Sequence, residues 1–374
     1  MANYELSVSF DYVPDWTFVE AVREIFQNAL DQQTSSEDNK MYYEYREEEK
    51  KLLIGNANST LSKKTLLIGS SGKRNEDNTI GQHGEGYKIA TVVLLREGLG
   101  LKVYNYLEKE IWTAKKINSR RYGTEIPAFV VEKCVPFIRP VENQNLIFEI
   151  TGVTQEMFDA IVDSNLVLQE DIGNIGETMD SNTGRVLLDK EYAGKIYVSG
   201  LYICTESRLK KGYDFKPNAI SLDRDRKTIS GSVLQSACSN LIAGTENPEL
   251  IRSMIDTYDG YFLESRYSSA MAAAGEILAK EFYEEYGNNA VPVSNQKEYD
   301  EAKKYGANPK IVSYSYLSII KRSELFAERN EAYAANVISL EDQFKDWYEK
   351  ARVYLPQELQ EEGDELVERI VDEL

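Results

Sequence analysis

Apolar and polar residues follow a helical period over residues 17–32. At about 100° per residue, one side of such a helix collects the apolar positions Val19, Val22, Phe26 and Ala29. The opposite side carries Glu24, Asn28 and Asp31, which fall within about 60° of one another. The Thr-Phe-Val-Glu run at the start has the spacing of a capping box. The pattern therefore predicts a helix whose polar face holds two carboxylates and an amide.

Five further stretches show the alternation, or the short apolar runs, that are typical of strands. They are residues 5–10, 52–54, 101–106, 111–115 and 146–150. A polar turn at residues 107–110 is expected to join the third and fourth of these strands into a hairpin. The highly charged stretch 39–51, which also contains tyrosines, is expected to form a second helix. Together these elements predict helices on one face of a mixed sheet that ends near residue 165.

The remainder of the chain changes character twice. Residues 166–245 predict a small strand-rich unit, with a strand at 194–204, and helical periodicity dominates from residue 248 onward. Helices are expected at residues 269–282, 299–305, 316–335 and 357–374. The last of these carries eight acids, one base and an apolar stripe, so it either packs on its own domain or binds a partner. The predicted fold class is α+β, with domains at residues 1–165, 166–245 and 246–374.

A glycine-rich segment precedes another expected helix. Gly81, Gly84 and Gly86 stand directly before the apolar run 87–96, which ends in a basic residue. Helix N-termini with exposed amides attract phosphate, because several N–H groups point at the same place. The segment therefore indicates an anion site at the entrance of a buried helix.

These two motifs together resemble the GHKL ATPase superfamily, whose ATP-binding domain is a Bergerat-type α/β sandwich. The family includes gyrase B, MutL, the ninety-kilodalton heat-shock chaperones and the sensor histidine kinases. Glu24-x-x-x-Asn28-x-x-Asp31 matches its first motif in full. The resemblance implies that Glu24 activates the attacking water and that Asn28 holds a Mg²⁺ ion that bridges the phosphates. A carboxylate base and an amide oxygen ligand suit these roles chemically.

The glycine segment resembles the second glycine motif of the same family, in which backbone amides wrap the β- and γ-phosphates under a lid. Residues 69–78 are expected to form that lid. The first glycine motif of the family, Asp-x-Gly-x-Gly, is replaced in this chain, and Asn56 stands where the family has its adenine-binding aspartate. The side-chain carbonyl of Asn56 can accept the same hydrogen bond from an adenine amino group.

In gyrase B and MutL the second domain reaches back into the ATP site with a lysine. The basic cluster at residues 224–227 is the candidate for such a reach, although a ladder of surface salt bridges is an equally good interpretation. The candidate catalytic residues are then Glu24, Arg226 and Lys227. The candidate nucleotide-binding residues are Asn28, Asp31, Asn56, Lys73, Gly81, Gly84, Gly86 and Lys88, with Asn28 as the metal ligand.

Composition narrows the function classes. The net charge is −19, which opposes nonspecific binding to nucleic acid and requires local cations, such as Lys73 and Lys88, around a bound nucleotide. No Gly-x-x-x-x-Gly-Lys-Ser/Thr occurs, which excludes a P-loop site. The three cysteines are far apart, and the one histidine, His83, lies inside the glycine motif. A zinc site, a disulfide framework and a histidine autokinase therefore receive no support.

The absence of a long apolar run and of a basic leader predicts a cytoplasmic protein without a membrane segment. The sequence thus predicts an ATP-binding protein of the GHKL type, resembling orphan bacterial or phage members. It is expected to hydrolyse ATP with Mg²⁺ and to control a protein partner through lid closure or an ATP-dependent homodimer. One alternative is a nucleotide-gated binding protein with negligible hydrolysis. Another is an acidic interaction or inhibitor protein on a relic ATPase fold.

Overall fold

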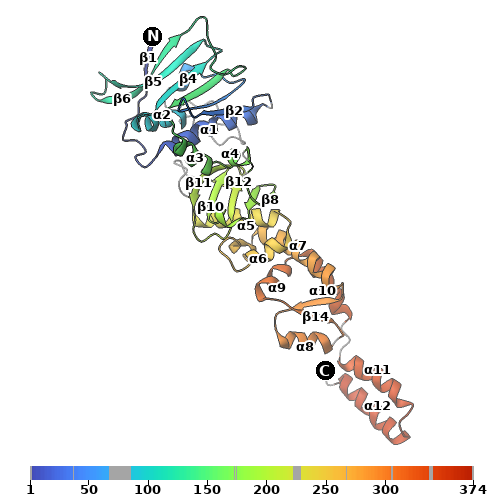
Figure 1. The fold of residues 1–374 in the computed structure, drawn as a ribbon. Coiled ribbons are helices and arrows are strands. Elements are labelled where there is room, and N and C mark those ends of the chain that lie inside the picture. Colours follow the sequence, from blue (N-terminus) through green and yellow to red (C-terminus); the bar gives the residue numbers. More distant parts are fainter. Residues whose placement is uncertain are drawn as a thin grey trace. The chain divides into compact units, whose positions relative to one another are not determined.

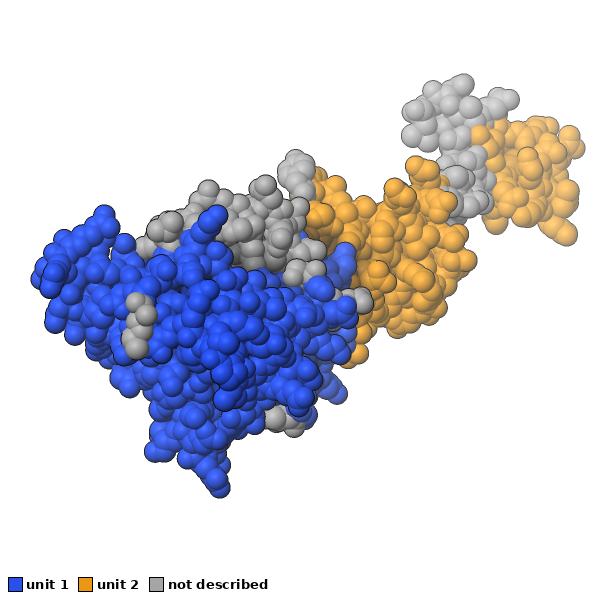
Figure 2. Space-filling view, turned by 90° about the horizontal axis from the view of Figure 1, so that it is seen from above, with its two compact units in different colours: residues 1–234 blue, residues 235–374 orange. Residues whose placement is uncertain are grey.

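The computed structural model describes residues 2–36, 38–66, 86–171, 173, 175–221, 229–266, 268–304, 306–336 and 340–372. The chain divides into two compact units, Met1–Leu234 and Gln235–Leu374 (Figure 2). The division into three domains at residues 165 and 245 stays a prediction.

The first unit is built on a seven-stranded sheet with the order β1-β6-β5-β4-β7-β3-β2 (Figure 1). Its strands are β1 (Ala2–Glu5), β2 (Met41–Arg46), β3 (Lys51–Asn56), β4 (Gly100–Asn105), β5 (Glu110–Asn118), β6 (Glu125–Lys133) and β7 (Leu146–Thr151). Every pairing between these strands is antiparallel, where we expected mixed pairing. The short β2–β3 and β4–β5 hairpins account for part of this pattern, because a tight turn can join only antiparallel neighbours.

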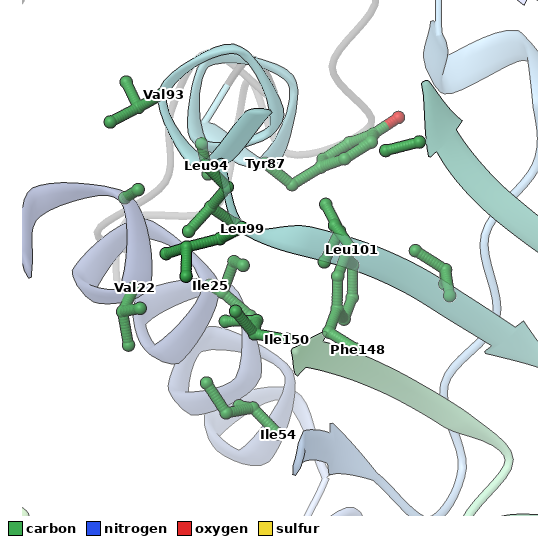
Figure 3. Packing of buried hydrophobic residues seen from close by; sticks show 14 of the residues in the cluster. Val22, Ile25, Ile54, Tyr87, Val93, Leu94, Leu99, Leu101, Phe148 and Ile150 are labelled. Carbon is green, nitrogen blue, oxygen red and sulfur yellow. The ribbon is translucent and has the colours of Figure 1, made fainter. Parts of the chain in front are cut away.

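Helices α1 (Phe18–Ser35) and α2 (Gly86–Arg96) cover one face of this sheet, and α3 (Gln155–Asp163) also packs on α1. Alternate residues of the strands enter the same buried cluster as the helices, for example Leu101 and Val103 in β4, and Phe148 and Ile150 in β7. Figure 3 shows Leu101, Phe148 and Ile150 gathered between the two helices and the strands. Period-two burial of this kind places one sheet face against helices, which confirms the predicted α+β class.

A second, five-stranded sheet with the order β11-β10-β12-β9-β8 completes the first unit. Its strands are β8 (Thr178–Ser181), β9 (Gly184–Leu187), β10 (Lys195–Val198), β11 (Leu201–Thr205) and β12 (Gly212–Phe215), and helix α4 (Leu166–Asp171) precedes them in the chain. Residues 194–204, expected as one strand, form the antiparallel pair β10–β11 instead. The chain reverses at Ser199 and Gly200, which have φ values of 50° and 78° and so adopt a turn conformation.

The second unit is mainly helical. Its helices are α5 (Gly231–Gly244), α6 (Pro248–Met254), α7 (Ser269–Tyr286), α8 (Gln296–Lys304), α9 (Tyr314–Ile320), α10 (Glu324–Asn336), α11 (Leu340–Arg352) and α12 (Gln357–Asp372). The first of them begins just before the boundary at residue 235. Two strands, β13 (Ala290–Val293) and β14 (Asn308–Ile311), pair in parallel. Within the residues that the structure describes, no helix has both the length and the apolar content needed to cross a bilayer.

Two helix predictions were wrong. Residues 39–51 form β2 and the start of β3, because Met41, Tyr43 and Tyr45 alternate along one side of β2 and pack against the core cluster. Residues 316–335 form two helices, α9 and α10, because Ser323 starts a new one. Its Oγ accepts a hydrogen bond from Phe326 N at 3.1 Å, as an N-cap does.

Two strand predictions also need correction. In the stretch 5–10 only Glu5 belongs to a strand, because the chain turns after Leu6, where Val8 N donates to Leu6 O at 2.8 Å. Strand β6, with its buried run from Ile126 to Val131, escaped the sequence prediction although it pairs with both β1 and β5. The other predicted strands of this sheet are confirmed.

Candidate functional site

The polar face of α1 is held in place at the start of the helix. Thr17 N donates to Glu20 Oε2 at 2.8 Å, and Val19 N donates to Thr17 Oγ1 at 3.3 Å, which completes the predicted capping box. The cap fixes where the helix begins and therefore which way each later side chain points. Glu24 and Asp31 are 5% and 2% exposed, so both carboxylates lie inside the first unit and not on its surface.

Glu24 lies against the first residue of α2. A Cβ atom added to Gly86 would be 2.4 Å from Glu24 Oε2, so any side chain here must displace that carboxylate. The other carboxylate oxygen, Oε1, is 3.5 Å from Arg23 Nη2. The last glycine of the Gly-x-x-Gly-x-Gly segment and the first acidic residue of the α1 motif therefore meet in space.

Asn28 occupies the next position along the same face of α1 and is half-buried. Its Nδ2 donates to Glu24 O at 2.9 Å, one helical turn earlier. This bond engages the amide nitrogen, so Oδ1 is the atom of Asn28 that can serve as a metal ligand.

Asn56, at the end of β3, is 2% exposed. Its Nδ2 donates to Ala29 O at 2.9 Å and to Asn39 O at 3.2 Å. The side chain therefore ties the end of β3 to the C-terminal half of α1, and its Oδ1 is the atom left for an acceptor role.

A buried polar network around Asn39 was missed by the sequence prediction. Asn39 Nδ2 donates to Ser59 Oγ at 2.9 Å and to Gln32 O at 3.2 Å, and Asn39 Oδ1 accepts from Asn58 N at 2.9 Å. Buried polar groups of this kind require partners, which here come from α1 and the loop after β3. The cluster of small polar residues at 56–60 is the signal that could have pointed to it.

A hydrogen bond joins two described residues, one on each side of the segment 67–85. Thr65 Oγ1 and the Tyr87 hydroxyl are 2.8 Å apart, just before and just after that segment. Burial raises the pKa of Tyr87 to about 12, so this hydroxyl stays protonated at neutral pH. Thr65 therefore lies at the first turn of α2, within hydrogen-bond distance of the residue that follows Gly86. Lys88, one residue further along α2, is only 1% exposed.

Asp31 also lines a cavity of about 500 Å³. The second sheet and the residues that follow β12 form the opposite wall, which includes Asn182, Ser199 and Lys216. Lys216 Nζ donates to Asn182 O at 2.9 Å. Lys216 was not among the predicted residues, although its position directly after a strand could have singled it out.

Several predicted site residues lie outside the described residues. They are Lys73, Gly81, Gly84, Arg226 and Lys227, together with the expected lid at residues 69–78. Of the predicted residues that are described, Glu24 lies against Gly86 and one helical turn from Asn28. Asn56, at the end of β3, instead contacts α1 further along, at Ala29. In the described ranges no group of three or more His, Cys, Asp or Glu residues could hold a metal ion.

Among known proteins, the chain is similar to solved structures and not to any family model or curated sequence. No family model matches the chain, and no curated protein matches its sequence. Among solved structures, the ATPase region of Saccharomyces cerevisiae topoisomerase II, bound to ICRF-187 (dexrazoxane), aligns with a TM-score of 0.31 and 10% identity. A second structure of that ATPase region aligns with a TM-score of 0.30 and 10% identity. Each alignment covers 50% of this chain and 62% of the other, so this chain spans less than two thirds of those structures.

Proposed function

We propose that this chain binds ATP with Mg²⁺ and hydrolyses it, as a protein of the GHKL type. The observation that supports this best is the contact between Glu24 and Gly86. Two motifs about sixty residues apart meet where a helix N-terminus, which favours phosphate, lies beside a buried carboxylate, which can act as a base.

In this proposal the γ-phosphate lies at the entrance of α2. A water molecule between the phosphate and Glu24 gives its proton to the Glu24 carboxylate while its oxygen forms the new bond to the γ-phosphorus. The bond from that phosphorus to the bridging oxygen breaks, and ADP leaves with the electron pair. The backbone N–H groups at the start of α2 are oriented for the negative charge on the phosphate oxygens.

The arrangement of Asn28 fits the proposed Mg²⁺ site. Mg²⁺ keeps several waters and takes few protein ligands, so a single amide oxygen beside nucleotide phosphates is a suitable donor set. When bound, the ion supplies positive charge that offsets the phosphates. Asn28 contributes Oδ1 and keeps its amide nitrogen on the helix backbone.

Asn56 and Asp31 are proposed to serve the adenine end of the nucleotide. The hydrogen bonds of Asn56 Nδ2 with two backbone carbonyls favour an orientation in which Oδ1 accepts from the base. The remaining proposed contacts rest on the sequence motif. They are Lys73, Gly81, Gly84 and Lys88 around the phosphates, and Arg226 or Lys227 as the reach from the second predicted domain.

We also propose that nucleotide binding controls a protein partner through closure of residues 69–78 or through ATP-dependent dimerisation. The bond between Thr65 and Tyr87 supports this part, because it holds together two described residues that flank the segment 67–85.

The test is a binding and turnover panel with ATP, GTP and a non-hydrolysable analogue, with and without Mg²⁺. We expect Glu24→Gln to retain ATP binding and to lose about 10²–10⁴-fold in turnover, the usual contribution of a positioned base. Glu149→Gln is the matched control, because Glu149 is also a buried carboxylate (6% exposed) but alternates with Phe148 and Ile150 and so faces the other side of the sheet.

Turnover of Glu24→Gln at the wild-type level would reject Glu24 as the base. ATP binding without measurable turnover in the wild type would favour the nucleotide-gated alternative. No binding of any nucleotide would leave the acidic interaction protein as the better interpretation.

A further inference from the structure

Arg23 has no direct part in the proposed reaction, but it connects two parts of the first unit. It precedes Glu24 in α1 and is only 8% exposed. Its Nη2 is 3.5 Å from Glu24 Oε1, and its Nη1 donates to Tyr202 O at 3.3 Å. The guanidinium also lies 5.5 Å from the centre of the Trp16 ring, a cation–π distance. One planar cation therefore contacts the proposed base and the second sheet together.

The Tyr202 carbonyl is placed for this contact by its strand. β11 is an edge strand of the second sheet, and Tyr202 N donates to Ser164 O at 3.0 Å, away from the ladder with β10. In an antiparallel strand the N–H and C=O of one residue point the same way, so the Tyr202 carbonyl also points outward. A β-bulge leaves Ile203 as an extra residue beside it.

β11 is joined to the main core cluster through Leu201, and the turn before it is joined to α4. Leu201 belongs to the main core cluster, and Leu166 N donates to Gly200 O at 2.7 Å. A movement of β11 relative to α1 would therefore shift the Tyr202 carbonyl, which is the acceptor of Arg23.

The two oxygens of Glu24 have different neighbours. Oε1 faces the Arg23 guanidinium, and Oε2 faces Gly86 at the start of α2. The Arg23 charge, 3.5 Å from Oε1, thus favours the rotation of the carboxylate in which Oε2 faces Gly86. Because a guanidinium donates through several N–H groups in a fixed plane, it can contact Tyr202 O and Glu24 together, whereas an ammonium is a point charge.

We infer that Arg23 is a positioning residue that couples the second sheet to the orientation of Glu24. This inference rests on the proposed ATP hydrolysis and names the way in which that site is regulated. It predicts that the second sheet changes the turnover rate through Arg23 without changing how tightly ATP binds.

The experiment measures the ATP dissociation constant, kcat and KM for wild type, Arg23→Met and Arg23→Lys, each in the wild-type and the Glu24→Gln background. We expect Arg23→Met to lower kcat about tenfold, part of what a positioned base contributes, with the dissociation constant within about twofold. Arg23→Lys should restore part of the rate. In the Glu24→Gln background Arg23→Met should have no further effect. Arg208→Met is the matched control, since Arg208 is an exposed arginine just after β11 that pairs with Glu206.

A second arm tests the carbonyl. Replacing Ile203 by its α-hydroxy analogue turns the Tyr202 carbonyl into an ester, a weaker acceptor, at the extra residue of the bulge. We expect kcat to fall and the dissociation constant to stay unchanged.

Equal losses of rate from Arg23→Met in both backgrounds, or a loss of ATP affinity, would overturn the inference and leave Arg23 a structural residue. An ester variant with wild-type kcat would remove the second sheet from the coupling. Failure of the wild type to bind or hydrolyse ATP would instead reject the proposed function, so the two failures are distinguishable.

Discussion

At the scale of single residues, Gly86 has no room for a side chain unless Glu24 moves. A Cβ there would lie 2.4 Å from Glu24 Oε2, closer than non-bonded atoms approach, so Gly86→Ala must displace the carboxylate. Alanine favours helix, so α2 should persist. We expect unchanged helical circular dichroism, a lower melting temperature and a loss of turnover.

Glu24→Ala provides the control for this clash. In the double variant the shortened side chain no longer meets the new methyl group, so Gly86→Ala should cost little further melting temperature in that background. A melting temperature lowered equally in both backgrounds would contradict the contact between Gly86 and Glu24.

Asn28 carries a second prediction at this scale. Asn28→Ala removes the only proposed protein ligand of Mg²⁺, and we expect the ATP dissociation constant measured with Mg²⁺ to rise about tenfold, or about 1.4 kcal/mol. The same titration in EDTA serves as the control and should give equal values for variant and wild type. Equal affinities in Mg²⁺ would show that Asn28 acts only through its bond with Glu24 O.

At the scale of elements, the start of α1 determines the geometry of the whole polar face. Burial of Glu20 opposes ionisation, but the hydrogen bonds from the Thr17 side chain and backbone outweigh it and lower the pKa of this carboxyl. A carboxyl with a lowered folded-state pKa adds stability above its unfolded pKa, and this stability is lost as the pH falls through the folded value.

We therefore expect the free energy of unfolding of wild type to exceed that of Glu20→Gln at neutral pH, and the difference to vanish toward acid pH. Thr17→Ala should cost about 1 kcal/mol, the usual value of an N-cap. Denaturant unfolding at several pH values measures both effects. A difference between wild type and Glu20→Gln that is constant with pH would contradict the role of the charged capping box.

At the scale of the whole molecule, the net charge of −19 must be reconciled with nucleotide binding and self-association. Two copies repel each other over about 10 Å at 0.1 M salt, the Debye length. We expect the Glu24→Gln variant to form a dimer in light scattering with ATP and Mg²⁺, more completely as salt is raised, and to remain monomeric with ADP. Monomer mass in all conditions would remove dimerisation from the proposal and leave lid closure.

The sequence by itself determined the elements whose hydrogen bonds and packing are local. The capping box joins residues three apart, and the face of α1 follows from a regular period, so helix α1 and its polar residues could be predicted. Strands β4 and β5 were predicted for the same reason, since their alternation is visible in any short window.

Only the tertiary structure decided contacts between residues far apart in the chain. Residues 39–51 carry helix-compatible charges, but Tyr43 and Tyr45 gain more by packing on the core than a solvated helix would offer, so they form a strand. Arg23 and the Tyr202 carbonyl are 179 residues apart, and no local pattern marks a backbone carbonyl as an acceptor. Such pairs depend on how the sheets pack, and packing is a property of the folded chain as a whole.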